Sequence, residues 1–341
     1  MKEPTVAIVI LNWNGWEDTI ECLESLYQIS YSDYRVILVD NNSSNESILK
    51  IEDYCNGKIK VKSEFFEYAK DNKPVKIIEY IKEESESKSD VKYLNNNGYL
   101  TLIKNDKNYG FAEGNNIGIR YALKALNADY ILLLNNDTVV DKDFLREMVN
   151  TGETSSNIGI IGPKIYYYNE PNTIWCIGGK IDWKFARGSH VGTNEVDVGQ
   201  YNRTEEFDYV SGSAFLVKRK VIDNVGLMDK KFFLYFEETD LALRASENGY
   251  KSVYAPEAKI WHKVSKSGGG LSKPIGLYYI TRNRWLFMKK WAKRSDYVLF
   301  VVYQAVGAII FPIVLSIYYK NRKLFGAYYR GLSDGITFKK V

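Results

Sequence analysis

VAIVILNWNG, at residues 6–15, decides the fold of this chain. Six apolar residues run without interruption from Val6 to Leu11, and polar Asn12 follows at once. An aliphatic and β-branched run of this kind is typical of a central parallel strand with both faces covered. It is too short to be the apolar region of a signal peptide, so we expect a buried strand that opens an α/β domain.

Strands and helices alternate in the residues that follow. The patterns predict helices at 18–27 and from about 108–118 to 126, and strands at 34–39, 99–104 and 130–134. Four strands alternating with helices indicate a doubly wound, mostly parallel sheet, in which ligands bind beyond the carboxyl ends of the strands. The polar residues expected at those ends are Asn12, Asn14, Asp40, Asn105 and Asp137.

Composition sets the broad class of the protein. The 341 residues suffice for one large domain with an extension, and the formal charge is only +4. A nucleic-acid-binding protein would carry a stronger basic excess, so we expect no nucleic-acid partner. The three cysteines, Cys22, Cys55 and Cys176, form no CxxC pair, which favours a reducing compartment over a disulfide framework.

Two regions interrupt or extend the alternation. Residues 55–98 are rich in charged and hydroxyl side chains and are interpreted as a partly flexible insertion within a catalytic domain spanning 1–265. Beyond residue 158 the strands are less regular. There we expect a strand at 209–217, a helix at 219–225, an acidic helix within 232–248 and a strand at 253–261.

Several of these residues suit the transfer of a sugar from a nucleoside diphosphate. Such a transfer needs groups that grip the nucleotide, a cation for the leaving diphosphate and a general base for the acceptor hydroxyl. Asp40, Asn12 and Asn14 can bind the nucleotide, as can the segment NYGFAEGNN at 108–116, whose glycines allow a close backbone approach. Taken singly, an aspartate at a strand end is more often a turn former or helix cap.

The remaining two requirements have candidates further along the chain. Asp137 follows an apolar strand in LLLNNDT, and His262 ends the segment AKIWH, so the two can share a divalent metal. A lone histidine is more often an ordinary core or surface residue. Glu237, Glu238 and Asp240 crowd together behind the aromatic FFLYF, and crowding and desolvation both raise a carboxyl pKa towards that of a useful base. The same triplet also suits a helix N-terminus.

The ordered set of motifs resembles the family 2 glycosyltransferases with the GT-A fold, particularly their rhamnosyltransferase-like branch. The segments that carry the resemblance span residues 5 to about 265: VAIVILNWNG (6–15), VDNNSS (39–44), NYGFAEGNNIG (108–118), LLLNNDT (132–138), GSAFLVKR (212–219), FLYFEETDLALR (233–244) and WH (261–262). The resemblance implies an inverting transfer that uses Mn²⁺ or Mg²⁺.

Roles for individual residues follow from the resemblance. It implies that Asp40 contacts the nucleotide base, that Asp137 and His262 hold the metal, and that Glu238 is the general base, with Asp240 as the fallback. The other candidate site residues are Glu237 beside the base and, at the nucleotide, Asn12, Asn14, Asn108, Gly110, Asn115 and Asn136. Two departures stand out: the metal motif reads Asn135-Asn136-Asp137, with one carboxylate fewer, and the acidic pair is Glu-Glu where the family usually has Glu-Asp.

The C-terminal part, residues 266–341, is predicted to be a membrane-associated helical extension. An amphipathic basic helix is expected at 275–294, and residues 297–319 contain no charge. A helix of that length covers about 34 Å, enough to cross a bilayer, although Pro312 also allows a re-entrant hairpin and a soluble packing helix stays possible. Both flanks are basic, which suits anionic lipids and leaves the orientation open. We place the catalytic domain on the cytoplasmic face of the cell membrane.

The predicted partners are a nucleotide-sugar donor, a glycan or polyprenyl-diphosphate-linked acceptor and the membrane surface. Arg282 and Arg284 are candidates to meet the acceptor diphosphate, or they simply lie at the interface. The donor stays open between dTDP-rhamnose and a UDP-hexose. A nucleotidyltransferase or dehydrogenase would need a Gly-rich loop where NWNGWED stands, which leaves a non-catalytic sugar-binding protein as the alternative from another class.

Overall fold

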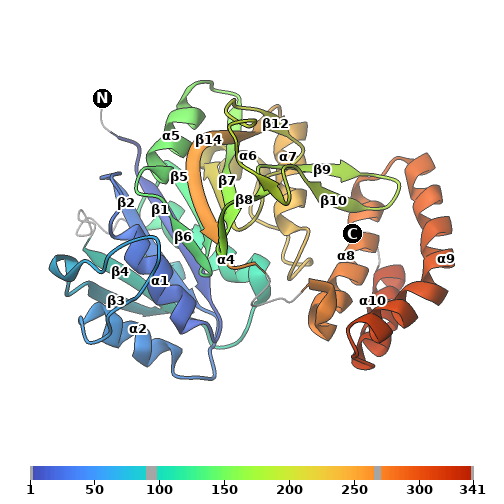
Figure 1. The fold of residues 1–341 in the computed structure, drawn as a ribbon, viewed down its shortest axis with the longest axis horizontal. Helices are drawn as coiled ribbons and strands as arrows, with labels where there is room; N and C mark the ends of the chain where they lie inside the picture. Colours follow the sequence, from blue (N-terminus) through green and yellow to red (C-terminus); the bar gives the residue numbers. More distant parts are fainter. Residues whose placement is uncertain (1–2, 90–97, 265–269, 339–341) are drawn as a thin grey trace.

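One large sheet runs through the protein in the computed structural model, which describes residues 3–89, 98–264 and 270–338 (Figure 1). Its main strands lie side by side in the order β11 (Glu195–Val196), β8 (Glu170–Cys176), β7 (Ile158–Tyr167), β13 (Ala214–Lys218), β5 (Tyr130–Asn135), β1 (Val6–Asn12), β2 (Tyr34–Asp40), β4 (Tyr99–Lys104) and β3 (Lys76–Ile81). From β5 to β3 all neighbours are parallel, whereas β13 is antiparallel to β5 and β7. The predicted α/β architecture with a mostly parallel sheet is confirmed.

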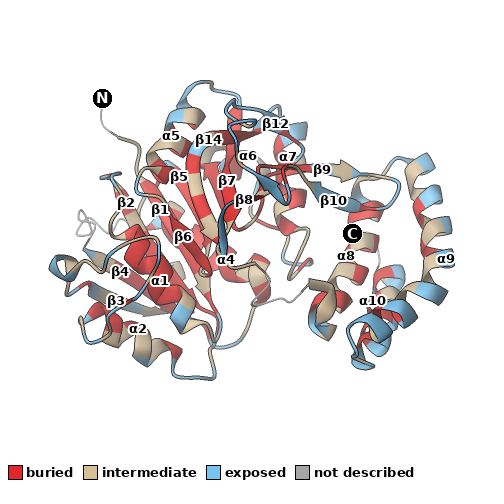
Figure 2. Cartoon of the chain, in the orientation of Figure 1, coloured by how far each residue is buried: buried red, intermediate tan, exposed pale blue. Residues whose placement is uncertain are grey.

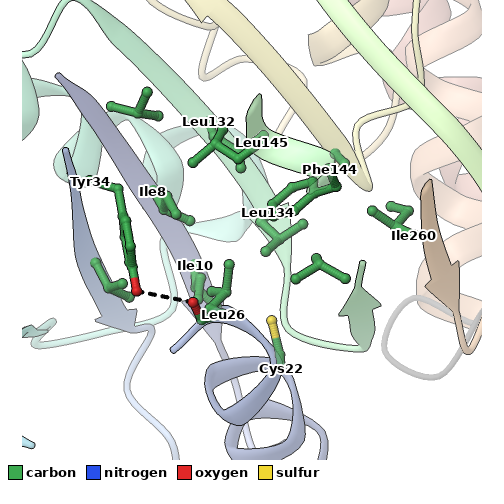
Figure 3. Packing of buried hydrophobic residues seen from close by; sticks show 14 of the residues in the cluster. Ile8, Ile10, Cys22, Leu26, Tyr34, Leu132, Leu134, Phe144, Leu145 and Ile260 are labelled. Carbon is green, nitrogen blue, oxygen red and sulfur yellow. Dashed lines mark hydrogen bonds between the residues drawn. The ribbon is translucent and has the colours of Figure 1, made fainter. Parts of the chain in front are cut away.

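Helices cover both faces of this sheet. One group comprises α1 (Trp16–Leu26), α2 (Ser47–Cys55) and α5 (Phe144–Glu153), and the other comprises α4 (Gly110–Lys124), α6 (Arg219–Val225) and α7 (Glu237–Glu247). Ile8 and Ile10 of β1 pack with the first group, whereas Ala7 and Val9 pack with the second. Figure 3 shows the first core around Ile8 and Ile10. Successive strand residues point to opposite faces, and both faces are covered, so β1 is apolar at every position before Asn12.

A second set of strands builds the edge that carries the candidate site. β14 (Lys251–His262) runs parallel to β7 and antiparallel to the short β6 (Thr138–Val140), and β12 (Glu206–Phe207) pairs with β14. In this register His262 lies opposite Thr138, beside the turn after β5. A separate hairpin of β9 (Gly179–Asp182) and β10 (Arg187–His190) projects towards the C-terminal helices (Figure 1).

The segment at 55–98 contains more regular structure than expected. It includes a short 3-10 turn (Lys70–Asn72), the edge strand β3 and the helix α3 (Lys82–Ser87), while residues 90–97 lie outside the described residues. β3 reads KIIEYI and is largely solvent-accessible. An edge strand of this kind lacks the continuous apolar run that marks the central strands, so its pattern did not separate it from the polar segment.

Three helices form the C-terminal extension. They are α8 (Pro274–Trp291), α9 (Arg294–Tyr318) and α10 (Lys323–Thr337), preceded by a 3-10 turn at Gly270–Ser272. The uncharged segment predicted at 297–319 lies within α9 except for Tyr319, which follows the end of the helix. Because α9 continues through Pro312, the hairpin interpretation is wrong. Among the described residues, α9 is the one helix long and apolar enough to cross a bilayer. Figure 2 shows that much of its outer surface is exposed.

Candidate active site

Asp137 and His262 meet at the edge of the sheet. Asp137 lies in the turn between β5 and β6, and His262 is the last residue of β14, so the register brings them together. The Asp137 Oδ1 atom lies 3.1 Å from His262 Nε2, and both side chains are buried. Burial opposes ionisation of Asp137, but the hydrogen bond and charge of His262 outweigh it and hold the pKa of Asp137 below its usual value.

The chemistry of this pair fits a divalent cation shared with a substrate. Carboxylate oxygen and imidazole nitrogen are both ligands for Mn²⁺, and the buried Nδ1 of His262 has no hydrogen-bond partner within the described chain. No cluster of three or more His, Cys, Asp or Glu side chains suited to a metal occurs among the described residues. The two ligands therefore suit an ion whose other positions are filled by phosphate oxygens and water.

An aromatic contact beside His262 was not predicted. The ring of Trp175 makes edge contacts with His262 at 4.9 Å and with His190 at 4.7 Å between ring centroids. Burial and the charge of His262 lower the pKa of His190 and so favour its neutral form. Trp175 and His190 come from strands β8 and β10, and no motif in the sequence joins them to residue 262.

Asp40, the last residue of β2, is held by several hydrogen bonds. It accepts hydrogen bonds from the Asn12 amide at 2.7 Å, from the Ser43 hydroxyl at 2.6 Å and from the Ser43 backbone N–H at 2.9 Å. Asn12 is fully buried and its amide orients Asp40, so in this structure its role at the strand end is to position that carboxylate. Asn14 accepts from the backbone N–H of Ser44, which fixes the same loop. Ser43 was missed, although an Asp followed by short polar residues is a sequence signal for hydrogen bonds from nearby backbone N–H groups to its side chain.

Asn136 links this strand end to the turn that contains Asp137. Its amide donates to the Gly15 carbonyl at 3.2 Å and to the Thr19 hydroxyl at 2.9 Å. Thr19 in turn donates to Asn12 at 2.9 Å. A polar chain therefore runs from Asn136 through Thr19 and Asn12 to Asp40, and it fixes the ends of β1, β2 and β5 relative to one another.

The segment at 108–116 shapes the start of α4. Gly110 has φ of 78°, and a Cβ there would lie 2.5 Å from the ring of Phe233, so the close approach predicted to a ligand is made to this ring. Asn108 accepts from the Gly110 N–H at 2.8 Å, and the Asn115 amide donates to the Phe111 carbonyl at 2.9 Å. In this structure all three predicted nucleotide residues stabilise the helix start.

Glu237 and Glu238 open α7 as a pair of poorly solvated carboxyls. Each has an Oε2 atom that is buried without a hydrogen-bond partner among the described residues. Burial raises the pKa of both, and the charge of Glu238 raises the pKa of Glu237 further. A Cβ added to Gly212 would lie 3.5 Å from Glu238 Cγ, and the adjacent Ser213 carbonyl accepts from the Asn135 N–H at 2.9 Å. The pair therefore lies at the same end of the sheet as Asp137.

Asp240 has a different environment from the other two acids. It is fully buried and accepts from Arg244 Nε at 2.9 Å, Lys290 Nζ at 2.6 Å and Trp291 Nε1 at 2.9 Å. These contacts occupy both carboxylate oxygens with cations and an indole N–H. The prediction of Asp240 as the fallback base therefore conflicts with the geometry, which makes it an anchor between α7 and α8.

The loop at 232–236 is held in an uncommon conformation by α8. Three of its residues have left-handed φ values, which are rare outside glycine: Phe233 (64°), Tyr235 (70°) and Phe236 (75°). The buried Asn283 amide donates to three carbonyls of this loop, those of Phe232, Leu234 and Tyr235, at 2.8, 2.8 and 2.9 Å. The C-terminal extension therefore fixes the segment from which the acidic pair emerges.

Comparison with known proteins shows which family this chain matches. The model of the family described as "Glycosyltransferase like family 2" matches residues 4–287. The chain is 28% identical to the low-salt glycan biosynthesis hexosyltransferase Agl10 of Haloferax volcanii, over 82% of this chain and 74% of that protein. It is 39% identical to N-acetylglucosaminyl-diphospho-decaprenol L-rhamnosyltransferase of Mycobacterium tuberculosis, but only over 18% of this chain and 20% of that protein.

A solved structure shows the same fold. The mannosyltransferase PcManGT from Pyrobaculum calidifontis, in complex with GDP-Man and Mn²⁺, aligns with a TM-score of 0.56 over 100% of this chain and 89% of its own. The sequence identity is 12%, so this likeness bears on the architecture alone.

Proposed function

This chain belongs to glycosyltransferase family 2, and we propose that it transfers a sugar from a nucleotide-diphosphate donor to a hydroxyl of a glycan or lipid-linked acceptor. The enzymes of this family invert the anomeric centre, so the acceptor must attack from the face opposite the leaving diphosphate. The observation that carries the proposal is the acidic pair Glu237–Glu238 at the same sheet end as the Asp137–His262 pair.

Asp40 is the residue proposed to contact the nucleotide base. Its hydrogen bonds with Asn12 and Ser43 hold its carboxylate at the end of β2. Asn14 and Asn136 stabilise the loops on either side of it. The nucleotide roles of Asn12, Asn108, Gly110 and Asn115 are then indirect, because these residues position the surrounding backbone.

Asp137 and His262 are the residues that would hold a divalent cation, Mn²⁺ or Mg²⁺. Such an ion, when bound, offsets the negative charge that develops on the leaving diphosphate. The pKa of Asp137 lies below its usual value because of His262, so Asp137 can offer an ionised carboxylate, whereas His262 would have to be neutral to offer a ring nitrogen to the ion. The neighbouring Asn135 and Asn136 lack charge, so the protein contributes a single carboxylate to this turn.

Glu238 is the proposed general base. Its raised pKa makes it a better proton acceptor than an ordinary glutamate, and among the described residues nothing competes for a hydrogen bond with its Oε2. As the acceptor hydroxyl attacks the anomeric carbon, its proton passes to a Glu238 carboxylate oxygen. Glu237, with the more strongly raised pKa, is the member of the pair that stays protonated.

The acceptor and the location are also proposals. The M. tuberculosis relative is named for a decaprenol-diphosphate substrate, and α9 exposes a broad aliphatic surface between basic flanks. Both favour a lipid-linked acceptor used at the cytoplasmic face of the cell membrane. The same relative is a rhamnosyltransferase, whereas Agl10 is a hexosyltransferase, so dTDP-rhamnose and UDP-hexoses are the donors to test first.

Calorimetric titration with UDP and dTDP, each with and without Mn²⁺, tests the proposal. We expect metal-dependent binding of one nucleotide, and we expect Asp137→Ala to abolish the metal dependence. A folded wild-type protein that binds neither nucleotide would instead favour a non-catalytic, membrane-bound sugar-binding protein.

A further inference from the structure

One face of α9 is exposed along nearly its whole length. Its exposed aliphatic side chains recur every three or four residues, which places them on a single face of the helix (Figure 2): Val298, Val302, Val306, Ile309, Ile313 and Ile317. Phe300, Gln304 and Leu315 lie on the opposite face and are buried. Residues 297–319 carry no charge, so α9 offers a hydrophobic phase one free face and keeps its other face on the protein.

The buried face of α9 is packed against other helices in both of its halves. In the first half, the ring of Phe300 contacts Trp285 of α8 at 5.0 Å between ring centroids. In the second half, Phe311 contacts Tyr328 of α10 at 5.9 Å, and Leu315 belongs to the same hydrophobic cluster as Tyr328. The helix is therefore held by the rest of the extension over about 22 Å of its axis.

Pro312 ties α9 to α10 more specifically. A proline has no backbone N–H, so the Ala308 carbonyl lacks the donor that it would have in an unbroken helix. The Tyr329 hydroxyl of α10 donates to this carbonyl at 2.7 Å. An unpaired carbonyl is costly in hydrocarbon, so a membrane environment favours the two helices staying packed together.

α10 is in turn packed closely on α8. A Cβ added to Gly331 would lie 2.5 Å from the Tyr278 carbonyl oxygen, so glycine is what permits this approach. The Tyr278 hydroxyl donates to Asp334 at 2.6 Å. Lys289 donates to three carbonyls at the end of α10, at 3.0, 2.7 and 2.9 Å: those of Gly335, Ile336 and Phe338.

α8 is fixed to the catalytic domain by polar and aromatic contacts. Arg282, one of the two arginines considered for the acceptor diphosphate, donates to the carbonyls of Lys231 and Phe232 at 2.6 and 2.8 Å. The rings of Phe233 and Tyr279 stack at 4.7 Å between centroids. Together with the Asn283 contacts described above, these join the catalytic domain, α8, α10 and the buried face of α9 into one packed body.

This packing disfavours a helix that crosses the bilayer. If α9 crossed it, either α10 would enter the hydrocarbon with its exposed Arg330 and Asp334, or the contacts between α9 and the other helices would have to break. A helix that lies parallel to the membrane surface avoids both costs, because its exposed face enters the lipid while its buried face stays on the protein.

The charges around α9 suit the same orientation. Asp296 is the one acidic residue between Lys293 and Lys323. Five exposed cations lie at the two ends of the helix: Lys293, Arg294, Lys320, Arg322 and Lys323. In a helix parallel to the surface, both ends can meet the anionic headgroups of one leaflet. Two copies of the chain that met through this face would bring basic ends together in either direction, which like-charge repulsion opposes.

We propose that α9 lies in the plane of one membrane leaflet, with its exposed aliphatic face among the lipid chains and its basic ends at anionic headgroups, and that it does not cross the bilayer. The inference deepens the membrane location given under the proposed function and rests on that location alone, because it requires no particular donor or acceptor. It places α10 on the same side of the membrane as the catalytic domain.

The accessibility of introduced cysteines tests on which side α10 lies. Ser333→Cys in α10 and Val198→Cys in the catalytic domain are both at exposed positions, whereas the native Cys22, Cys55 and Cys176 are buried. Sealed membrane vesicles from cells that express the full chain are treated with a membrane-impermeant maleimide before and after they are opened with detergent. We expect the two variants to show the same ratio of labelling before and after opening. Labelling of Ser333→Cys from the side opposite to Val198→Cys would overturn the proposal.

A depth measurement tests whether α9 lies in the plane of the leaflet. Cysteines that replace Val302, Ile309 and Ile317 carry a fluorophore, and the purified protein is bound to phosphatidylcholine–phosphatidylglycerol vesicles whose lipids are brominated near the headgroup or near the chain end. The three positions cover about 22 Å of helix, so a crossing helix would place Ile309 much deeper than the other two. We expect equal quenching depth at all three positions, with wild-type melting temperatures, and no quenching at a labelled Val198→Cys.

Two results of the depth measurement would overturn the proposal. A gradient of depth along α9 would show that the helix crosses the bilayer. Absence of quenching at all three positions would show that this face does not contact lipid. The assay contains no nucleotide or acceptor, so its failure is separable from a failure of nucleotide binding in the titration above.

Discussion

The indole N–H of Trp291 donates a 2.9 Å hydrogen bond to Asp240, and this contact joins the last residue of α8 to the helix that carries the acidic pair. Lys290 binds the same carboxylate at 2.6 Å. Together with the Asn283 contacts to the loop at 232–236, this makes α8 part of the structure that holds the acidic pair in place. Substitutions in α8 that break these contacts should therefore alter the position of the acidic pair.

Asp240→Asn should destabilise the protein without removing its base. Asn keeps the shape of the side chain but weakens the interactions with Arg244, Lys290 and Trp291, so we expect a loss of about 2 kcal/mol and a fall in Tm of roughly 5 °C. Thermal unfolding measures the loss of stability. The rate of sugar transfer per folded molecule shows whether the base is retained, and we expect this rate to stay close to that of the wild type. A variant that melts normally but transfers no sugar would restore Asp240 as a candidate base.

Glu238→Gln should remove the base and leave the stability of the protein unchanged, in contrast to Asp240→Asn. Gln cannot accept the proton, so transfer should fall roughly a thousandfold, whereas nucleotide binding and Tm should be retained. Glu247→Gln, at the exposed end of the same helix, is the matched control and should transfer normally. Steady-state rates with the identified donor provide the measurement. Near-normal transfer by Glu238→Gln would reject the assignment of the base.

Glu237 makes stability depend on pH in a defined direction. Its folded-state pKa is raised well above the usual 4.5, so the folded state binds more protons than the unfolded state once the pH passes that value. The carboxyl therefore contributes its full stability below about pH 4.5, and this contribution is lost as the pH rises through the folded-state pKa.

Glu237→Gln removes this titration. We expect the Tm of the variant to exceed that of the wild type at pH 8 and to approach it at pH 4. Melting curves across that range provide the test. A difference that is independent of pH would show that the pKa of Glu237 in the folded state does not differ from its value in the unfolded state.

The central strands were predictable because burial on both faces leaves a simple pattern. β1, β2, β4 and β5 are nearly unbroken apolar runs, and each lies where the sequence indicated. β7 is equally buried, but Gly159, Gly162 and Pro163 interrupt its sequence and conceal the strand. The topology rule for parallel sheets then placed Asp40 and Asp137 at one end of the sheet.

Side-chain partners were less accessible to prediction. Asp240 resembles its acidic neighbours in sequence, but Lys290 and Trp291 lie about fifty residues away, and only the packing of α8 on α7 brings them to it. Similarly, Arg282 and Arg284 are two residues apart on one helix, yet they project differently because the helix turns about 200° between them. Pattern alone does not decide which of the two is satisfied by backbone carbonyls.

The exposed surface of α9 should mediate membrane attachment. Ile309 is 69% exposed, so an aspartate there would not disturb the soluble fold but would oppose insertion among lipid chains. We expect Ile309→Asp to keep the wild-type Tm and to lose about tenfold or more in co-sedimentation with anionic vesicles. Val198→Asp, at an 82% exposed position of the catalytic domain, introduces the same charge as a control and should sediment normally. If Ile309→Asp also sediments normally, then this surface does not contact the bilayer, and α9 serves instead as a packing helix.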